Sequence, residues 1–253
     1  MEFKDLGLSQ ATLKAISELG MQTPTTVQAD VIPSVLEGKD IFTIAPIRSG
    51  KTYSYVLPLT DILASKKGLN ILILTADSYQ AANVSDSFAL FNKYHQTDDN
   101  EDDSNVIIAT PDLALDLMNE EKVNFANVNI LVIDDINLIK KKHQLSSLEK
   151  VLKVLPSEKQ NIIFTNRRSK ETQDLLDQIL KTPTEIKVDK TKVDEVETSQ
   201  TAETIDKAET VKPVFKMREE KIDEKAVELD SKYHTFGSKT PHFILIQGEL
   251  AHR

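Results

Sequence analysis

The fold of this chain is decided by residues 45–52, which read Ala-Pro-Ile-Arg-Ser-Gly-Lys-Thr and directly follow the apolar run at 40–44. A strand that ends in a tight turn and continues as a helix opened by Gly-Lys-Thr is typical of a phosphate-binding loop. In such a loop, backbone N–H groups face the phosphates, Lys51 reaches them, and the Thr52 hydroxyl binds Mg²⁺. Arg48 stands where such loops have a small residue, so the stretch predicts a nucleotide site of altered form.

Composition narrows the class of protein. The 253 residues carry a formal net charge of −9, which argues against a general binder of nucleic-acid backbone, since that affinity comes from clustered Lys and Arg. There is no cysteine, so disulfides and thiolate metal sites are excluded. The N-terminus has no basic region followed by an apolar core, and no apolar run is long enough to span a bilayer. We therefore expect a soluble, cytoplasmic protein that does not bind membranes.

Strand-like and helix-like segments alternate through the first three quarters of the chain. This alternation predicts an α/β fold with a parallel sheet covered by helices on both faces. The expected strands are 40–45, 70–75, 106–110, 129–134 and 161–165. The expected helices are 9–19, 25–36, 52–64, 78–94, 112–119, 145–155 and 169–180.

The carboxyl ends of the expected strands are where ligands of parallel sheets bind. Polar or small residues stand at these ends: Ala45, Thr75, Thr110, Asp134 and Thr165. We therefore expect the functional site along this one edge of the sheet.

The composition changes near residue 189. Residues 1–189 are predicted to form one domain, and residues 190–253 a charged linker or disordered tail that is mostly irregular, with a short helix near 217–228. The apolar run at 242–246 is either a strand that joins a sheet edge or a short sticky segment.

Two further motifs identify a family. Phe3 and the block 24–28 (Pro-Thr-Thr-Val-Gln) precede the phosphate loop, and 130–137 (Ile-Leu-Val-Ile-Asp-Asp-Ile-Asn) follows it at the distance of an Asp-Glu-Ala-Asp motif. In order and spacing, residues 3–189 resemble the N-terminal RecA-like domain of a DEAD-box ATP-dependent RNA helicase. The resemblance implies a RecA-like fold, with ATP and Mg²⁺ as ligands.

The resemblance also assigns roles to individual residues. It implies that Phe3 and Gln28 contact adenine, and the Gln28 amide offers both a donor and an acceptor for that purpose. Residues 49–52 would hold the phosphates, comprising Ser49, Gly50, Lys51 and Thr52. Thr52 and Asp134 would hold Mg²⁺, partly through water, and Asp135 would be the catalytic base in place of the family's Glu. The alternative for Asp135 is the N-cap of the following helix, and Thr25 is a candidate cap as well.

Other positions depart from the family pattern. Asp135 has a stem one methylene shorter than Glu, Asn137 replaces the last Asp of the motif, and 165–167 (Thr-Asn-Arg) replaces Ser-Ala-Thr. At 75–79 and 110–113, where the family grips RNA, the arginines of the pattern are missing and Asp77 stands at one of their positions. Acidic residues at 98–103 repel phosphates.

These departures leave three hypotheses. The first is a helicase-like ATP-binding protein that hydrolyses ATP weakly or not at all and does not unwind RNA by itself. The second is a pseudo-helicase scaffold without nucleotide binding, which binds a protein partner through its acidic surface or its C-terminal tail. The third is a helicase half that needs a partner domain in trans. RNA binding is expected to be weakened in all three.

Overall fold

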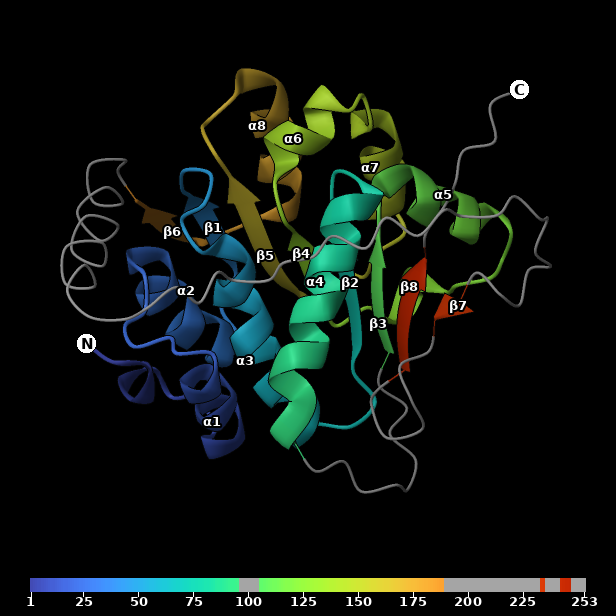
Figure 1. The fold of residues 1–253 in the computed structure, drawn as a ribbon. Helices are drawn as coiled ribbons and strands as arrows, with labels where there is room; N and C mark the ends of the chain where they lie inside the picture. Colours follow the sequence, from blue (N-terminus) through green and yellow to red (C-terminus); the bar gives the residue numbers. More distant parts are fainter. Residues whose placement is uncertain (96–104, 189–232, 235–241, 247–253) are drawn as a thin grey trace, which may run out of the picture.

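A single mixed sheet forms the centre of the computed structural model, which describes residues 1–95, 105–188, 233–234 and 242–246. The strand order is β6-β1-β5-β4-β2-β3-β8-β7 (Figure 1). The first six of these strands pair in parallel throughout. Their bounds are β1 Ile41–Ile44, β2 Asn70–Leu74, β3 Asn105–Ala109, β4 Ile130–Ile133, β5 Gln160–Thr165 and β6 Thr184–Lys187. Two more strands, β7 Tyr233–His234 and β8 His242–Ile246, extend the sheet beyond β3.

Helices cover both faces of the sheet, as the alternation of segments predicts. One face carries α1 Gln10–Glu18, α2 Thr26–Leu36, α3 Lys51–Ser65 and α4 Ser78–Phe91, together with the short turns η1 Phe3–Leu6 and η2 Asn92–Tyr94. The opposite face carries α5 Pro111–Asn119, α6 Ile136–Lys141, α7 Leu145–Leu152 and α8 Lys170–Ile179, with the turn η3 Phe125–Asn127. Within the described ranges, no helix is long and apolar enough to cross a bilayer.

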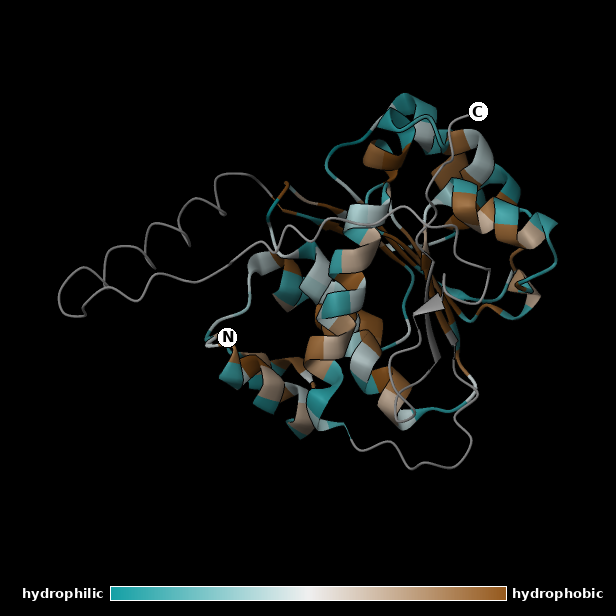
Figure 2. Ribbon diagram, turned by 45° about the vertical axis from the view of Figure 1, so that its right-hand side comes forward, coloured by the Kyte–Doolittle hydropathy of each residue, from teal (hydrophilic) through white to brown (hydrophobic). Residues whose placement is uncertain are grey.

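Side-chain alternation along the strands builds two separate cores. In β4, Ile130 and Val132 face the α1–α4 side, whereas Leu131 and Ile133 face the α5–α8 side. Successive residues of a strand point to opposite faces, so a strand buried on both sides must be apolar at every position. Figure 2 shows the result: hydrophobic strands lie inside, and the helices present hydrophilic faces outward.

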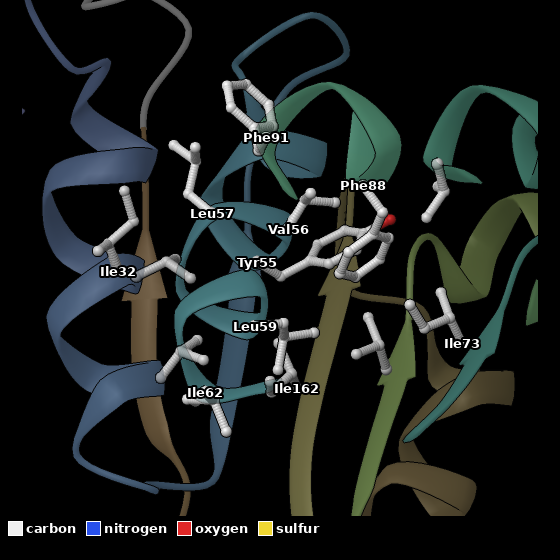
Figure 3. Close-up of a cluster of buried hydrophobic side chains, with 14 of the residues drawn as sticks. Ile32, Tyr55, Val56, Leu57, Leu59, Ile62, Ile73, Phe88, Phe91 and Ile162 are labelled. Atoms are coloured by element: carbon white, nitrogen blue, oxygen red, sulfur yellow. The ribbon is translucent and has the colours of Figure 1, made fainter. Parts of the chain in front are cut away.

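The first core is centred on helix α3, which begins at the phosphate loop. Tyr55 is fully buried (Figure 3). Its ring packs against Phe164 of β5, with ring centroids 5.5 Å apart. Leu57, Leu59 and Phe88 are also fully or almost fully buried around it. Burying a large apolar side chain stabilises a fold by about 1.5–3 kcal/mol. The start of α3 is therefore anchored to the centre of the molecule.

The predicted elements agree with this fold, and three points refine them. Strand β6 and helix α6 were not expected, because both are short and their sequences lack a long periodic pattern. The run at 242–246 forms a strand: β8 pairs in parallel with β3, which is the sheet-edge alternative (Figure 1). Apart from β7 and β8, the predicted irregular tail, including the helix near 217–228, lies outside the described residues, and so do the acidic residues 98–103.

Candidate nucleotide-binding site

The phosphate loop connects β1 to α3 at the carboxyl edge of the sheet. Gly50 is the N-cap of α3 and has a left-handed backbone with φ of 84°. A Cβ atom there would meet Gln28 Nε2 at 2.7 Å and Thr25 Oγ1 at 2.8 Å. Both the positive φ and this close approach require glycine.

Helix α2 is fastened to the phosphate loop by its own capping box. The Thr25 hydroxyl accepts a hydrogen bond from the Gln28 N–H at 3.3 Å, and Gln28 Oε1 accepts one from the Thr25 N–H at 3.0 Å. The same two side chains reach onward to the loop: Thr25 Oγ1 donates to the Ser49 carbonyl at 2.9 Å, and Gln28 Nε2 donates to the Gly50 carbonyl at 3.4 Å. Thr25 therefore both caps a helix, as expected, and positions the loop.

The two residues assigned to adenine are buried. Gln28 is 3% exposed, and both ends of its amide are engaged by the capping box and the loop. Phe3 is 4% exposed and belongs to the first hydrophobic core. Their contact with adenine stays a prediction, whereas their structural roles are visible.

Lys51 folds back onto its own loop. Its Nζ donates to the carbonyls of Ala45 at 3.2 Å and Pro46 at 3.1 Å, and it lies 3.9 Å from Asp135 Oδ2. Ser49 Oγ also donates to the Pro46 carbonyl, at 2.8 Å. Burial lowers the pKa of Lys51, while the nearby Asp135 and Asp134 charges oppose that shift. The predicted phosphate-binding amine is thus at the site, and its donors are occupied by the loop.

Two adjacent carboxylates close β4 opposite this lysine. Asp134 is 7% exposed, and burial raises its pKa to about 6. The positive charge of Lys51 lowers this pKa, whereas the negative charge of Asp135 raises it further. Among the described residues, no side-chain hydrogen bond reaches the Asp134 carboxylate. A buried carboxylate without a partner is costly unless a cation joins it. An oxygen donor set of a carboxylate and the Thr52 hydroxyl, completed by water, fits Mg²⁺.

Asp135 serves as the N-cap of α6. Its Oδ1 accepts hydrogen bonds from the N–H groups of Asn137 and Leu138, both at 3.1 Å. Burial raises the pKa of Asp135, and the Lys51 charge and these two hydrogen bonds lower it. Oδ1 of Asp135 therefore has the capping role that was the alternative to catalysis, while Oδ2 of Asp135 faces Lys51. Its role as a catalytic base stays a prediction.

Asn137 joins the end of β4 to the end of β5. Its Nδ2 donates to Thr165 Oγ1 at 2.7 Å, to the Arg167 carbonyl at 2.6 Å and to Asn166 Oδ1 at 3.3 Å. The Thr165 hydroxyl donates to the Arg167 carbonyl at 2.8 Å. The sequence suggested only that Asn137 lacks the charge of the family's aspartate. In the structure, its amide connects the ends of β4 and β5 by donating hydrogen bonds.

Arg48 occupies the mouth of the loop with a φ of 66°, a conformation that favours glycine. Its side chain is exposed, so it does not fill the loop, and neighbouring Ile47 is 72% exposed. In the described ranges, no group of three or more His, Asp or Glu side chains is arranged to hold a metal ion. Any metal at this edge therefore has few protein ligands.

Comparison with known proteins agrees with this geometry. The model of the DEAD/DEAH box helicase family matches residues 25–175, which is more than half of the chain, so the chain belongs to this family. A crystal structure of a DEAD box protein from the hyperthermophile Methanococcus jannaschii superposes with a TM-score of 0.68 at 25% identity, covering 75% of this chain and 56% of that one. The RecA-like fold expected from the sequence is confirmed.

Curated relatives point the same way. The ATP-dependent RNA helicase HAS1 of Saccharomyces cerevisiae is 31% identical over 196 residues, which is 69% of this chain and 39% of that protein. The DEAD-box ATP-dependent RNA helicase RhpA of Helicobacter pylori is 24% identical over 273 aligned positions, covering 99% of this chain and 56% of that protein. The chain thus spans 56% of the length of RhpA and 39% of the length of HAS1.

Proposed function

We propose that this chain binds Mg-ATP at the phosphate loop and hydrolyses it slowly or not at all. The observation that carries the proposal is the single hydrogen-bonded unit formed by Thr25, Gln28 and the loop that ends in Lys51. Lys51 of this unit attracts the buried Asp134 carboxylate, to which no side chain of the described residues donates a hydrogen bond. Mg²⁺, when bound, would neutralise charge on the phosphates, and Thr52 and Asp134 are the residues that would hold it.

Binding requires the Lys51 amine to exchange the Ala45 and Pro46 carbonyls for phosphate oxygens. A lysine is a good phosphate ligand because its ammonium group has three donors on a flexible stem. Asp135 is the only carboxylate besides Asp134 that the described residues place against Lys51, so it is the proposed base. One of its oxygens is committed to capping α6, and misplacement of a reacting group by 1 Å can cost about 100-fold in rate.

Calorimetric titration with Mg-ATP tests binding. The unmutated protein is expected to bind below millimolar concentration, and Lys51→Ala is expected to lose at least tenfold in affinity, because a charge-assisted contact is worth about 1.5–3 kcal/mol. Lys39→Ala, an exposed lysine before β1, is the matched control. No binding by the unmutated protein would refute the nucleotide proposal, and unchanged binding by Lys51→Ala would refute the phosphate role.

Phosphate release in the presence of RNA tests hydrolysis. Asp135→Asn keeps an oxygen that can cap α6 but removes the base, so any turnover that depends on Asp135 falls by about 100-fold or more. An equal rate in both proteins would show that Asp135 is not the base. If the chain instead acts as one half of a helicase, adding a partner domain in trans would raise the rate.

A second candidate function is a protein-binding scaffold without nucleotide binding or RNA affinity, and two ion pairs along the carboxyl edge of the sheet favour it. Lys142 lies 3.4 Å from the carboxylate of Asp77, which follows β2, and Lys140 in α6 lies 2.7 Å from Glu171 in α8, so two cations are already neutralised. Phosphate-backbone binding depends on such cations and weakens with salt. Measurable RNA affinity that falls steeply with salt would exclude the pure scaffold.

A further inference from the structure

Arginine is distributed unevenly in this acidic chain. The arginines are Arg48, Arg167, Arg168, Arg218 and Arg253, against a net charge of −9. The three that lie in the described residues all stand just beyond the carboxyl ends of β1 and β5. Guanidinium groups bind phosphate and carboxylate through two parallel hydrogen bonds, which makes arginine the preferred residue for planar anion recognition. One short edge of the sheet is therefore locally basic.

A pocket of about 400 Å³ lies at this edge, between the ends of β1, β5 and β6. Its apolar wall consists of Ile44, Pro46 and Val188, of which Ile44 and Val188 are less than 10% exposed. Neither Gln28, Lys51 nor Asp134 lines it. The pocket is therefore beside the proposed nucleotide site and shares only Pro46 with the phosphate loop.

The charged residues of the pocket are not equivalent. Arg168 forms an ion pair with Glu185, and its guanidinium lies 5.5 Å from the centre of the Phe42 ring. This pair is neutral and is held in place by the aromatic ring beneath it. Arg167 and Lys187 also line the pocket, and no ion pair joins either side chain to another described residue. The pocket therefore has two positive charges, on Arg167 and Lys187, that no ion pair of the described residues neutralises, and these lie beside an apolar wall.

We propose that this pocket binds a small phosphate monoester that carries an apolar body. A phosphate dianion matches the two free charges of Arg167 and Lys187, and Ile44, Pro46 and Val188 provide the surface for the apolar part. The volume lies in the range of small-molecule sites, about 300–1,000 Å³, rather than that of an extended macromolecular groove. The proposal does not depend on ATP binding, because Lys51 takes no part in it.

Phenyl phosphate is the probe, and amide chemical shifts of the labelled full-length protein report where it binds. Saturable shifts are expected at residues 44–46, 166–168 and 185–188. Inorganic phosphate, which lacks the apolar body, and benzyl alcohol, which lacks the charge, should each bind at least tenfold more weakly. If benzyl alcohol bound with the same affinity as phenyl phosphate, the anion site would be refuted. If inorganic phosphate bound with the same affinity as phenyl phosphate, the role of the apolar wall would be refuted.

Two sets of variants separate this pocket from the phosphate loop. The double substitution Arg167→Gln with Lys187→Gln should weaken phenyl phosphate at least tenfold, while Lys170→Gln with Lys181→Gln, two exposed lysines outside the pocket, should not. Lys51→Ala should leave phenyl phosphate affinity unchanged even if it abolishes Mg-ATP binding. Loss of phenyl phosphate in Lys51→Ala, or shifts confined to residues 50–52, would place the ligand in the phosphate loop and overturn the proposal. Thermal unfolding of each variant confirms that it is folded.

Discussion

The two halves of the sheet's carboxyl edge differ in how they use their polar side chains. At the ends of β2 and β3, these side chains hold helices: Asp77 caps α4, Thr110 caps α5, and Gln144 Nε2 donates to the Ala76 carbonyl at 3.1 Å. At the ends of β1, β4 and β5, Asp135 also caps α6. Among the described residues, however, no side chain donates a hydrogen bond to Asp134 and no ion pair reaches the Arg167 side chain. The proposed ligand chemistry therefore involves only one half of this edge.

The strongest test of the nucleotide half is Asp134→Asn. Since the pKa of Asp134 is raised from 3.8 to about 6, the folded state holds its proton more tightly than the unfolded state, and stability falls as pH rises through this window. At pH 7 the charged form costs about 3 kcal/mol, at 1.36 kcal/mol per pKa unit. Chemical denaturation should show Asp134→Asn more stable by roughly that amount at pH 7 and equal to the unmutated protein near pH 4. A gain that does not vary with pH would contradict the assignment.

Asn137→Asp restores the residue of the family motif and is expected to damage this protein. The new carboxylate would face the Arg167 carbonyl and the Asn166 side-chain oxygen without a proton to donate, which costs about 2 kcal/mol at a buried site. The loss should shrink at low pH as the carboxyl is protonated. Asn83→Asp on the exposed face of α4 is the control, with a change within about 0.5 kcal/mol. Equal effects of the two variants would refute the donor role of Asn137.

Substitutions of Asp77 test the half of the edge at the ends of β2 and β3, where polar side chains cap helices. Replacing it by Ala removes the N-cap of α4 and should cost about 1 kcal/mol in the free energy of unfolding. Asp77→Asn keeps a capping oxygen and loses only the charge near Lys142, so its change should be within about 0.5 kcal/mol. Urea denaturation that shows both variants equally destabilised would mean that the ion pair, and not the cap, is what Asp77 contributes.

Arg48→Gly is expected to have the smallest effect. A non-glycine residue in the left-handed region costs about 1–2 kcal/mol, which the substitution by glycine recovers. The greater conformational entropy of glycine in the unfolded chain offsets about 0.5–1 kcal/mol of this recovered stability. The variant should therefore be more stable by about 0.5 kcal/mol, whereas Ile47→Gly, at a position without positive φ, should be slightly less stable. Differential scanning calorimetry of both variants resolves the sign; a destabilised Arg48→Gly would show that the side chain has a stabilising contact.

Much of the fold was predictable because its strands are buried on both faces. A run such as 130–133 is apolar at every position, and the following Asp134 marks the strand end independently of any contact. Strand β6 was missed because it lies at an edge: Glu185 and Lys187 are exposed and only Ile186 is buried, so the segment resembles a loop. Short edge strands carry little of the signal on which sequence prediction relies.

The site was predictable in its residue types but not in its hydrogen bonds. The position of Lys51 near Asp135 follows from the carboxyl ends of β1 and β4, which lie at the same edge of the sheet with only β5 between them. The return of its amine to Ala45 and Pro46 depends on loop conformation, which no spacing encodes. Likewise, Asn137 differs from aspartate only by an amide NH₂ in place of a carboxylate oxygen. The three oxygen acceptors around this NH₂ show that Asn137 donates hydrogen bonds where an aspartate would accept them. The pocket at the ends of β1, β5 and β6 depended on β6 and was therefore not visible in the sequence.

The position of the Lys51 amine has a consequence for measured affinity. The carbonyls of Ala45 and Pro46 accept hydrogen bonds from this amine, so they would compete with a phosphate group for it. The apparent dissociation constant is the intrinsic one divided by the fraction of molecules whose loop is open. An open fraction of about 1% would weaken binding about 100-fold without altering any contact in the complex. The affinity for the proposed nucleotide would therefore depend as much on how often the loop releases Lys51 as on the contacts that hold the nucleotide.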